Sequence, residues 1–373
     1  MRLTSLATSL ATSLATSLAT SLATLALALA PYADATATTV RIHYDAGAKG
    51  ISVRADKGAT TWSKGAAATP GPNNTWTFTW PDSLGEIAMK PVLGEDSVSM
   101  GGVYKLAVRS SVDIYPFFGA PFGRLEIIDA FAAPQLGNSR KLRIYLPASY
   151  EENKAKRYPV LYMHDAQNLF DAKSAAYGVE WGIDETVNRL VATGVMDEVI
   201  VVGIDNTPDR IAEYTPCCDP KYGGGKLDAY MAFVADTVKP YIDKTLRSLP
   251  GKESTAIMGS SLGAIASVYI AQHRPEVFSR TGAVSGSFWW NQQALVNKLP
   301  ARVPVKFYLD AGTNNDGLEE SKLMRDALEK QGYRQNADLL FYEDAGGSHN
   351  EKSWAARVEK PLAWFFPWGS TRQ

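Results

Sequence analysis

The chain has 373 residues, of which 45% are hydrophobic and 21% charged, and its 38 basic and 39 acidic residues give a formal net charge of −1. This composition is typical of a globular protein, and the length allows two domains. Because neither sign of charge is in excess, the sequence predicts neither a nucleic-acid partner nor binding to an anionic membrane surface.

Residues 1–35 contain the tetrapeptide "TSLA" five times in succession, followed by "TLALALA". A repeat of four residues is too short to be a solenoid unit. The single early positive charge, Arg2, the mildly apolar stretch and the small residues after it predict an export signal that is cleaved near Ala35 or Ala37. Threonine and serine lower the hydrophobicity too far for a stable membrane span. We therefore expect a secreted or periplasmic mature protein.

Residues 38–118 have the pattern of an all-β domain. Short runs rich in β-branched and aromatic residues, such as "TTVRIHY", "ISVRAD" and "IAMKPVL", are separated by turn clusters such as "DAGAKG" and "TPGPNN". Strands of this length and spacing predict a small immunoglobulin-like β-sandwich.

The run "TWTFTW" places Trp76, Phe78 and Trp80 on one face of a strand, opposite three threonines. Such alternation usually marks the buried face, so we expect the three rings in the sandwich core. The alternative is a sugar-stacking platform, joined by Trp62, which would give this domain a glycan contact. In pattern, the segment resembles the carbohydrate-binding-type domains that precede some bacterial esterase domains.

Residues 120–369 show a different periodicity. Continuous apolar runs such as "YPVLYMHD", "EVIVVGID" and "VPVKFYLDAG" alternate with helix-like runs such as "GIDETVNRLVATG" and "GLEESKLMRDALEKQG". Apolar strands that alternate with amphipathic helices predict a mostly parallel sheet covered by helices on both faces. The second domain is therefore expected to be of the α/β class.

The pentapeptide "GSSLG" follows the predicted strand "STAIM" and precedes a helix that begins near Leu262. Of its two serines, only Ser261 has a glycine two positions away on each side. In the G-x-S-x-G turn the serine hydroxyl lies at the carboxyl edge of a sheet, beside backbone N–H groups that can hold an oxyanion. We therefore predict that Ser261 is a nucleophile and that Ser260 is a turn or packing residue.

A serine hydroxyl becomes a nucleophile at neutral pH only when a base removes its proton. The chain has four histidines. His43 lies in the β domain, and His164 ends a predicted strand. His273 closes a predicted helix, where a basic residue is favoured by the negative end of the helix dipole. His349, in "AGGSHNEKSW", follows the last predicted strand and a glycine pair, so it is the candidate base.

The acid that orients the base should lie between Ser261 and His349 in the chain, after the strand "VPVKFYLDAG". Two aspartates compete, Asp310 at the strand end and Asp316 within "GTNNDG". Either choice gives the order Ser, Asp, His of the α/β-hydrolases. The residue pattern alone leaves both open.

Several longer runs carry a family resemblance, among them "YPVLYMHDAQNLFD", "VVGIDNTPDRIAEYTP", "IMGSSLGAIASVYIA", "YLDAGTNND" and "AGGSHNEKSWAAR". Over residues 124–366 the chain resembles the esterase family of α/β-hydrolases. That family contains enterochelin esterases, feruloyl and acetyl-xylan esterases, S-formylglutathione hydrolases and mycolyltransferases. The resemblance implies an α/β-hydrolase fold and a serine carboxylic ester hydrolase that needs no metal or organic cofactor.

The resemblance also implies roles for individual residues. In the relatives the acid follows a "GT" pair, which corresponds to Asp316 here. The backbone N–H groups of Leu262 and Gln167 are implied as the oxyanion hole. The substrate is expected to be an aryl, acetyl or feruloyl-type ester, either a small molecule or linked to a polysaccharide. The alternatives are a ferric-siderophore trilactone, or acyl transfer to a sugar or lipid acceptor.

Aromatic residues near the predicted site offer walls for an aryl or sugar group, with the domain core as the alternative place for most of them. Arg210 and Glu213, in "DRIAEY", are expected to pair with each other, unless Arg210 meets an anionic part of the substrate. The candidate wall residues are Trp181, Tyr214, Phe288, Trp289 and Trp290.

The only two cysteines, Cys217 and Cys218, are neighbours. Consecutive Cα atoms lie about 3.8 Å apart, below the roughly 4.4–6.8 Å that is usual for a disulfide. A vicinal disulfide therefore requires a distorted peptide, although export to an oxidising compartment would allow it. No spacing of cysteine and histidine predicts a structural metal site.

Overall fold

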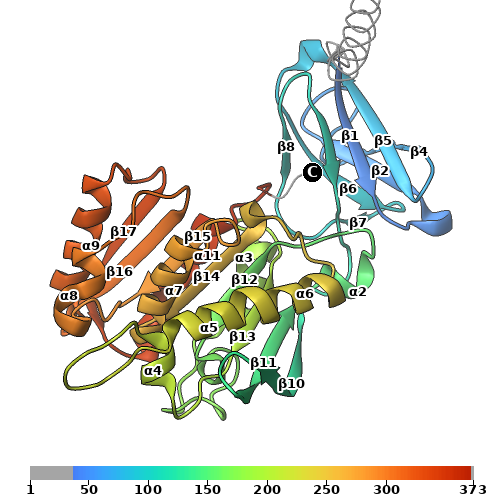
Figure 1. Cartoon of the computed structure of the whole chain (residues 1–373). Helices are drawn as coiled ribbons and strands as arrows, with labels where there is room; N and C mark the ends of the chain where they lie inside the picture. The colour runs from blue at the N-terminus through green and yellow to red at the C-terminus, as the bar shows by residue number, and fades with distance from the viewer. Residues whose placement is uncertain (1–36, 371–373) are drawn as a thin grey trace, which may run out of the picture.

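The computed structural model describes residues 37–370 and divides them into a small β-sandwich and a larger α/β part (Figure 1). The predicted export signal and Ala35 lie outside the described residues. Over residues 37–370, no helix combines the length and the apolar character needed to cross a membrane.

The β-sandwich consists of two sheets. One has the strand order β4-β5-β1-β9, and the other has the order β3-β2-β6-β7, with β8 paired to β6. The strands are β1 (Ala37–His43), β2 (Ile51–Ala55), β3 (Ala66–Ala67), β4 (Thr69–Pro70), β5 (Thr75–Pro81), β6 (Ile87–Leu93), β7 (Ser97–Val98), β8 (Tyr104–Leu106) and β9 (Ser111–Ile114).

The aromatic residues of β5 face the core of the sandwich. Trp80 is fully buried, and Trp76 and Phe78 pack against the same cluster of apolar side chains. The expectation of a core face is confirmed, and these three rings form no exposed platform. Trp62 is exposed and is not part of this apolar cluster.

The larger part is built on an eight-stranded sheet with the order β10-β11-β13-β12-β14-β15-β16-β17. β11 pairs antiparallel with both its neighbours, and all other adjacent pairs are parallel. The strands are β10 (Arg124–Ala133), β11 (Asn138–Leu146), β12 (Val160–His164), β13 (Ile200–Ile204), β14 (Thr255–Ser260), β15 (Arg280–Val284), β16 (Lys306–Asn314) and β17 (Leu339–Ser348).

Helices cover both faces of this sheet, as expected for buried apolar strands. α5, α6, α7 and α9 contribute to the apolar cluster on one face, and α3, α10 and α11 contribute to the cluster on the other. The helices are α2 (Ser149–Glu152), α3 (Ile183–Ala192), α4 (Arg210–Tyr214), α5 (Leu227–Phe233), α6 (Lys239–Thr245), α7 (Leu262–His273), α8 (Trp290–Asn297), α9 (Leu318–Lys330), α10 (Glu351–Arg357) and α11 (Glu359–Phe365). Short helical turns are η1 (Gly47–Lys49), η2 (Asp82–Leu84), η3 (Ala166–Asn168), η4 (Val234–Val238) and η5 (Lys252–Ser254).

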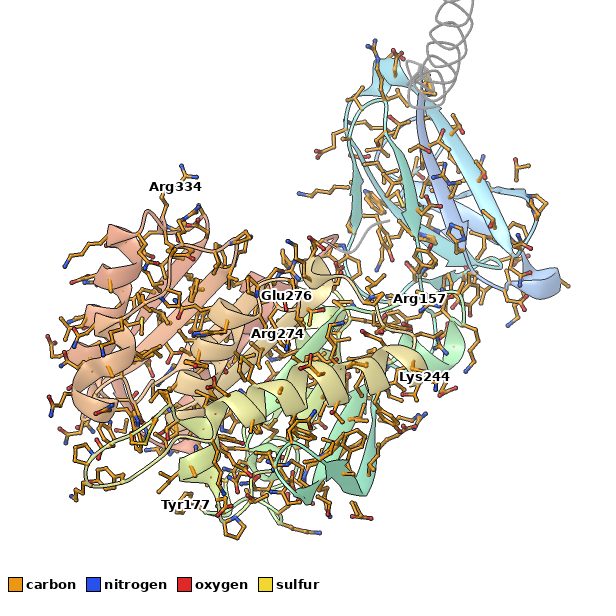
Figure 2. All side chains as sticks on the ribbon, viewed as in Figure 1. Arg157, Tyr177, Lys244, Arg274, Glu276 and Arg334 are labelled. Atoms are coloured by element: carbon orange, nitrogen blue, oxygen red, sulfur yellow. A yellow bond between two sulfur atoms is a disulfide. The ribbon has the colours of Figure 1, made fainter. Side chains whose placement is uncertain are left out.

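The sandwich packs at the amino ends of the parallel strands. Glu152, on α2 before β12, accepts hydrogen bonds from the Tyr44 hydroxyl and from the N–H groups of Phe118 and Gly119. In Figure 2, Arg157 and Lys244 lie toward the sandwich, whereas Tyr177 projects from the opposite end of the α/β part. The carboxyl edge of the sheet is therefore left clear of the sandwich.

Candidate active site

Ser261 occupies a strained turn between β14 and α7. Its backbone angles are φ 58° and ψ −119°, which lie outside the regions that residues with side chains normally adopt. The turn is tight because a Cβ atom at Gly259 would lie 2.8 Å from the His164 ring and 2.9 Å from the Gly263 carbonyl carbon. Close packing thus requires glycine at position 259, two residues before Ser261. The turn projects the Ser261 hydroxyl at the carboxyl edge of the sheet.

Three side chains that are far apart in the sequence form one hydrogen-bonded chain at this edge. Ser261 Oγ lies 3.0 Å from His349 Nε2, and His349 Nδ1 lies 2.8 Å from Asp316 Oδ1. His349 follows β17, and Asp316 lies in the loop between β16 and α9. The predicted nucleophile, base and acid are therefore hydrogen-bonded in the order that a serine triad has.

Asp316 is buried and held in its ionised form. Burial alone would raise its pKa, but hydrogen bonds from His349, the Ser285 hydroxyl and the Gly312 N–H, together with the charge of Arg357, outweigh burial and lower the pKa below its usual value. An ionised carboxylate is what a protonated imidazole needs as its partner during catalysis.

Asp310 lies in the same polar cluster but does not reach the histidine. Its carboxylate accepts from the Tyr308 hydroxyl at 2.8 Å and from the Ser285 N–H at 3.2 Å, and it lies 3.0 Å from Arg357. Burial raises the pKa of Asp310 to about 6, although Arg357 opposes that shift. Of the two aspartates left open by the residue pattern, the structure places Asp316 against His349.

Backbone N–H groups lie beside the serine. Leu262 is the first residue of α7, so its N–H has no acceptor within the helix. Gln167, in η3, lines the same cavity as Ser261. The turn that carries Gln167 starts at Asp165, which adopts the left-handed φ of 56°. The role of the Leu262 and Gln167 N–H groups as an oxyanion hole stays a prediction.

The structure corrects the expected pairing of Arg210 with Glu213. Arg210 instead binds Asp165 through two hydrogen bonds of 2.7 Å, and this charge holds the pKa of Asp165 low against the effect of burial. Glu213 pairs with the buried Arg140. Spacing in the helix would allow Arg210 and Glu213 to pair, but each has a partner from another segment: Glu213 is fully buried against Arg140 of β11, and Arg210 binds Asp165 in the turn before Gln167.

A cavity of about 560 Å³ opens beside Ser261 and His349. Apart from His349, its charged lining residues are Asp165, Glu351, Arg210 and Lys352, so two carboxylates face two basic groups. Its less polar walls include Tyr177, whose side chain is 79% exposed at the mouth, together with Val179 and Trp354.

The predicted aromatic walls do not line this cavity. Trp289 is 42% exposed and stacks edge-on against Tyr222, away from the lining residues. The other four candidates pack in the core because large rings fill space between sheet and helices as readily as they line a pocket. The four buried side chains are Trp181, Tyr214, Phe288 and Trp290.

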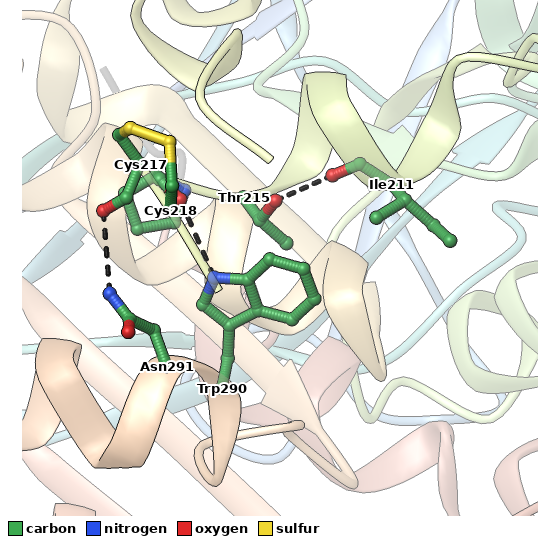
Figure 3. The surroundings of a disulfide bond; sticks show 7 residues. Ile211, Thr215, Cys217, Cys218, Trp290 and Asn291 are labelled. Carbon is green, nitrogen blue, oxygen red and sulfur yellow. Dashed lines mark hydrogen bonds between the residues drawn. A yellow bond between two sulfur atoms is a disulfide. The ribbon is translucent and has the colours of Figure 1, made fainter. Parts of the chain in front are cut away.

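Cys217 and Cys218 are joined in a vicinal disulfide (Figure 3). Its loop packs against the start of α8, where Trp290 Nε1 donates to the Pro216 carbonyl at 3.4 Å and Asn291 Nδ2 donates to the Cys217 carbonyl at 3.5 Å. Over residues 37–370, no group of three or more His, Cys, Asp or Glu side chains could hold a metal ion.

The fold is that of the α/β-hydrolase enzymes. This follows from the strand order of the sheet, the tight turn at Ser261, and the position of the site at the carboxyl edge of the sheet. The family model described as "Putative esterase" matches residues 133–365, which is more than half of the chain. The chain belongs to this esterase family and is a carboxylic ester hydrolase.

Individual relatives are distant. The chain is 27% identical over 240 residues to an endo-1,4-beta-xylanase/feruloyl esterase of Xylanibacter ruminicola, a match that covers 62% of this chain and 30% of that protein. A solved ferulic acid esterase aligns with a TM-score of 0.53 at 20% identity, over 66% of this chain and 98% of its own. The enterobactin esterase FES of Shigella flexneri aligns with a TM-score of 0.51 at 16% identity, over 88% and 92%. The chain thus matches less than a third of the Xylanibacter protein, and the structural likenesses describe the fold.

Sequence reasoning missed several residues around the site. Ser287 Oγ lies 3.1 Å from Ser261 Oγ, and Trp354 and Arg357 on α10 contact the buried polar cluster around Asp316. For the last two a signal existed in "HNEKSWAAR", since residues three apart lie on the same face of a helix. That spacing indicates a shared face but not what the face contacts.

Proposed function

We propose that Ser261 is the nucleophile of an exported esterase. Its expected substrates are aryl, acetyl or feruloyl-type esters. The observation that carries this proposal is the hydrogen-bonded chain from Ser261 through His349 to Asp316 at the mouth of a cavity. The leader of "TSLA" repeats supports export.

The mechanism proceeds in two steps through an acyl-enzyme. His349 takes the proton of Ser261 as the oxygen attacks the ester carbonyl, and Asp316 holds the imidazole in the required tautomer. The N–H groups of Leu262 and Gln167 stabilise the tetrahedral oxyanion. His349 then protonates the leaving alcohol and activates water, which releases the acid.

Charge in the cavity favours a neutral substrate. The charge of Asp165 is already neutralised by Arg210. The other two charged lining residues, Glu351 and Lys352, carry opposite charges, so the lining has no net charge from these four side chains. A ferric tris-catecholate is strongly anionic and would meet no net positive charge here. The Xylanibacter relative, whose name includes feruloyl esterase, agrees with an aryl ester, and export agrees with an ester linked to a polysaccharide.

A panel of esters tests this proposal: 4-nitrophenyl acetate, methyl ferulate, acetylated xylan and a catecholate trilactone. We expect hydrolysis of 4-nitrophenyl acetate and methyl ferulate. A serine-directed phosphonate should label Ser261, and this labelling should abolish the hydrolysis. Preference for the trilactone would establish the siderophore alternative. Transfer of the acyl group to an added sugar or lipid alcohol, in excess of free acid, would establish an acyltransferase.

Glu351 leads to a sharper prediction about the acyl group. Its side chain lines the cavity with only 7% exposure, and its hydrogen-bond partner within the described residues is the Asn168 amide at 3.5 Å. A hydrogen bond to a charged group contributes about 1.5–3 kcal/mol, so we expect methyl 4-hydroxycinnamate to exceed methyl 4-methoxycinnamate by roughly 10- to 100-fold in kcat/KM. Glu351→Met should remove this preference.

Lys352→Met is the matched control for Glu351, because it changes a neighbouring lining residue that offers no acceptor. It should leave the ratio of the two rates as in the wild type. Equal rates on the hydroxy and methoxy esters in the wild type would show that Glu351 does not select a phenolic acyl group.

A further inference from the structure

Arg357 is the last residue of α10, and only 2% of its side chain is exposed. Its guanidinium contacts three carboxylates: Asp316 at 2.9 Å, Asp344 at 2.9 Å and Asp310 at 3.0 Å. One buried cation is thus shared among three carboxylates. Asp310 and Asp344 belong to the adjacent strands β16 and β17, and Asp316, the acid of the candidate triad, lies in the loop after β16.

The two oxygens of Asp316 have different partners. Oδ2 accepts from the Ser285 hydroxyl at 2.6 Å, the Gly312 N–H at 2.6 Å and Arg357 at 2.9 Å. Oδ1 lies 2.8 Å from His349 Nδ1. Because three donors occupy Oδ2, rotation of the carboxylate would break several hydrogen bonds at once, and Oδ1 remains directed at the histidine.

Ser285 links this arrangement to α10. Its residue follows β15 with a left-handed φ of 46°, and its Oγ accepts from Trp354 Nε1 at 2.8 Å and from Arg357. Trp354 also packs edge-on against the His349 ring, with the ring centres 5.1 Å apart. Helix α10 therefore contacts the base through Trp354 and the acid through Arg357.

We infer that Arg357 is a positioning residue for catalysis, which holds Asp316 so that one oxygen is reserved for His349. The inference rests on the proposed function of Ser261. Arg357 touches no reacting atom and acts through Asp316. Misplacement of a catalytic group by 1 Å can cost on the order of 100-fold in rate, so loss of this contact should reduce turnover more than substrate binding.

Steady-state kinetics on 4-nitrophenyl acetate test this inference with the full chain. Arg357→Met should lower kcat by roughly 100-fold, with KM changed by less than about threefold. Arg357→Lys should recover part of the loss because lysine keeps the charge but donates from a single point. Asp344→Asn removes one partner of the guanidinium without touching Asp316 and should retain most of kcat.

A control separates positioning from general stability. Lys156 forms an ion pair with the buried Glu198 at the opposite, sandwich-facing edge of the sheet. Lys156→Met should lower the melting temperature but leave kcat of the folded fraction near the wild-type value. Equal losses of kcat in Arg357→Met and Lys156→Met would overturn the inference.

Two further measurements keep the test decisive. If Arg357→Met does not fold, Arg357→Lys and Ser285→Ala still remove or weaken a donor to Asp316 Oδ2, and normal kcat in both would overturn the inference. Failure of the proposed function is recognised separately, because Ser261→Ala would then retain hydrolysis whatever happens at Arg357.

Discussion

Ser261→Ala should lower kcat for ester hydrolysis on the order of 10⁶-fold, as expected when the nucleophile of a triad is removed. The reason is that no other hydroxyl lies within hydrogen-bonding distance of His349 in the described part of the chain. Initial rates on 4-nitrophenyl acetate and methyl ferulate, with the melting temperature measured alongside, check this result.

Ser260→Ala provides the comparison for the nucleophile. Ser260 ends β14 and is buried, and it makes no hydrogen bond to His349. We expect this variant to retain most of the activity. Loss of activity in Ser260→Ala with retention in Ser261→Ala would exchange the roles of the two serines.

Asp316→Asn is expected to lower kcat by about 10⁴-fold with little change in KM, because the amide favours the wrong tautomer of the base. Asp310→Asn should lower kcat far less, since Asp310 contacts Tyr308, Ser285 and Arg357 but not His349. Both variants keep the size of the side chain, so circular dichroism should show folded proteins. A larger loss in Asp310→Asn would contradict the assignment of Asp316.

The chain positions of the site follow from local patterns. An apolar strand, a glycine-framed serine and a following helix predict a nucleophile turn, and the structure has that turn at Ser261. The last strand followed by "GGSH" predicts a base after the sheet, and His349 is there. Such patterns succeed because strand, turn and helix are set by residues close together in the chain.

The residue pattern left Asp310 and Asp316 open, the family resemblance implied Asp316, and the folded chain shows which of the two contacts His349. Both lie near the carboxyl end of β16, and a difference of six residues in the chain does not say which carboxylate meets the histidine. In the folded chain the Gly312 N–H donates to Oδ2 of Asp316, and Oδ1 lies 2.8 Å from His349 Nδ1.

The expectations that the structure corrected concern contacts between distant segments. An aromatic residue looks the same in the sequence whether it lines a pocket or fills the core. Only its burial in the folded chain separates these two roles, and it places four of the predicted wall residues in the core: Trp181, Tyr214, Phe288 and Trp290. Arg210 meets Asp165 across 45 residues rather than its neighbour Glu213. A nearby partner in sequence is a poor guide here because folding brings Arg140 to Glu213 and Asp165 to Arg210 from other segments of the chain.

The sequence by itself predicted the two-part organisation, the α/β class of the larger part, and the chain order of the candidate nucleophile, acid and base, because each depends on local periodicity and turn chemistry. Only the tertiary structure showed that Asp316, which the family resemblance implied, is the aspartate that contacts His349, what lines the cavity, and that Arg357 shares its charge among three carboxylates. Those features depend on distances between strands and helices far apart in the chain, and packing of the whole sheet sets these distances.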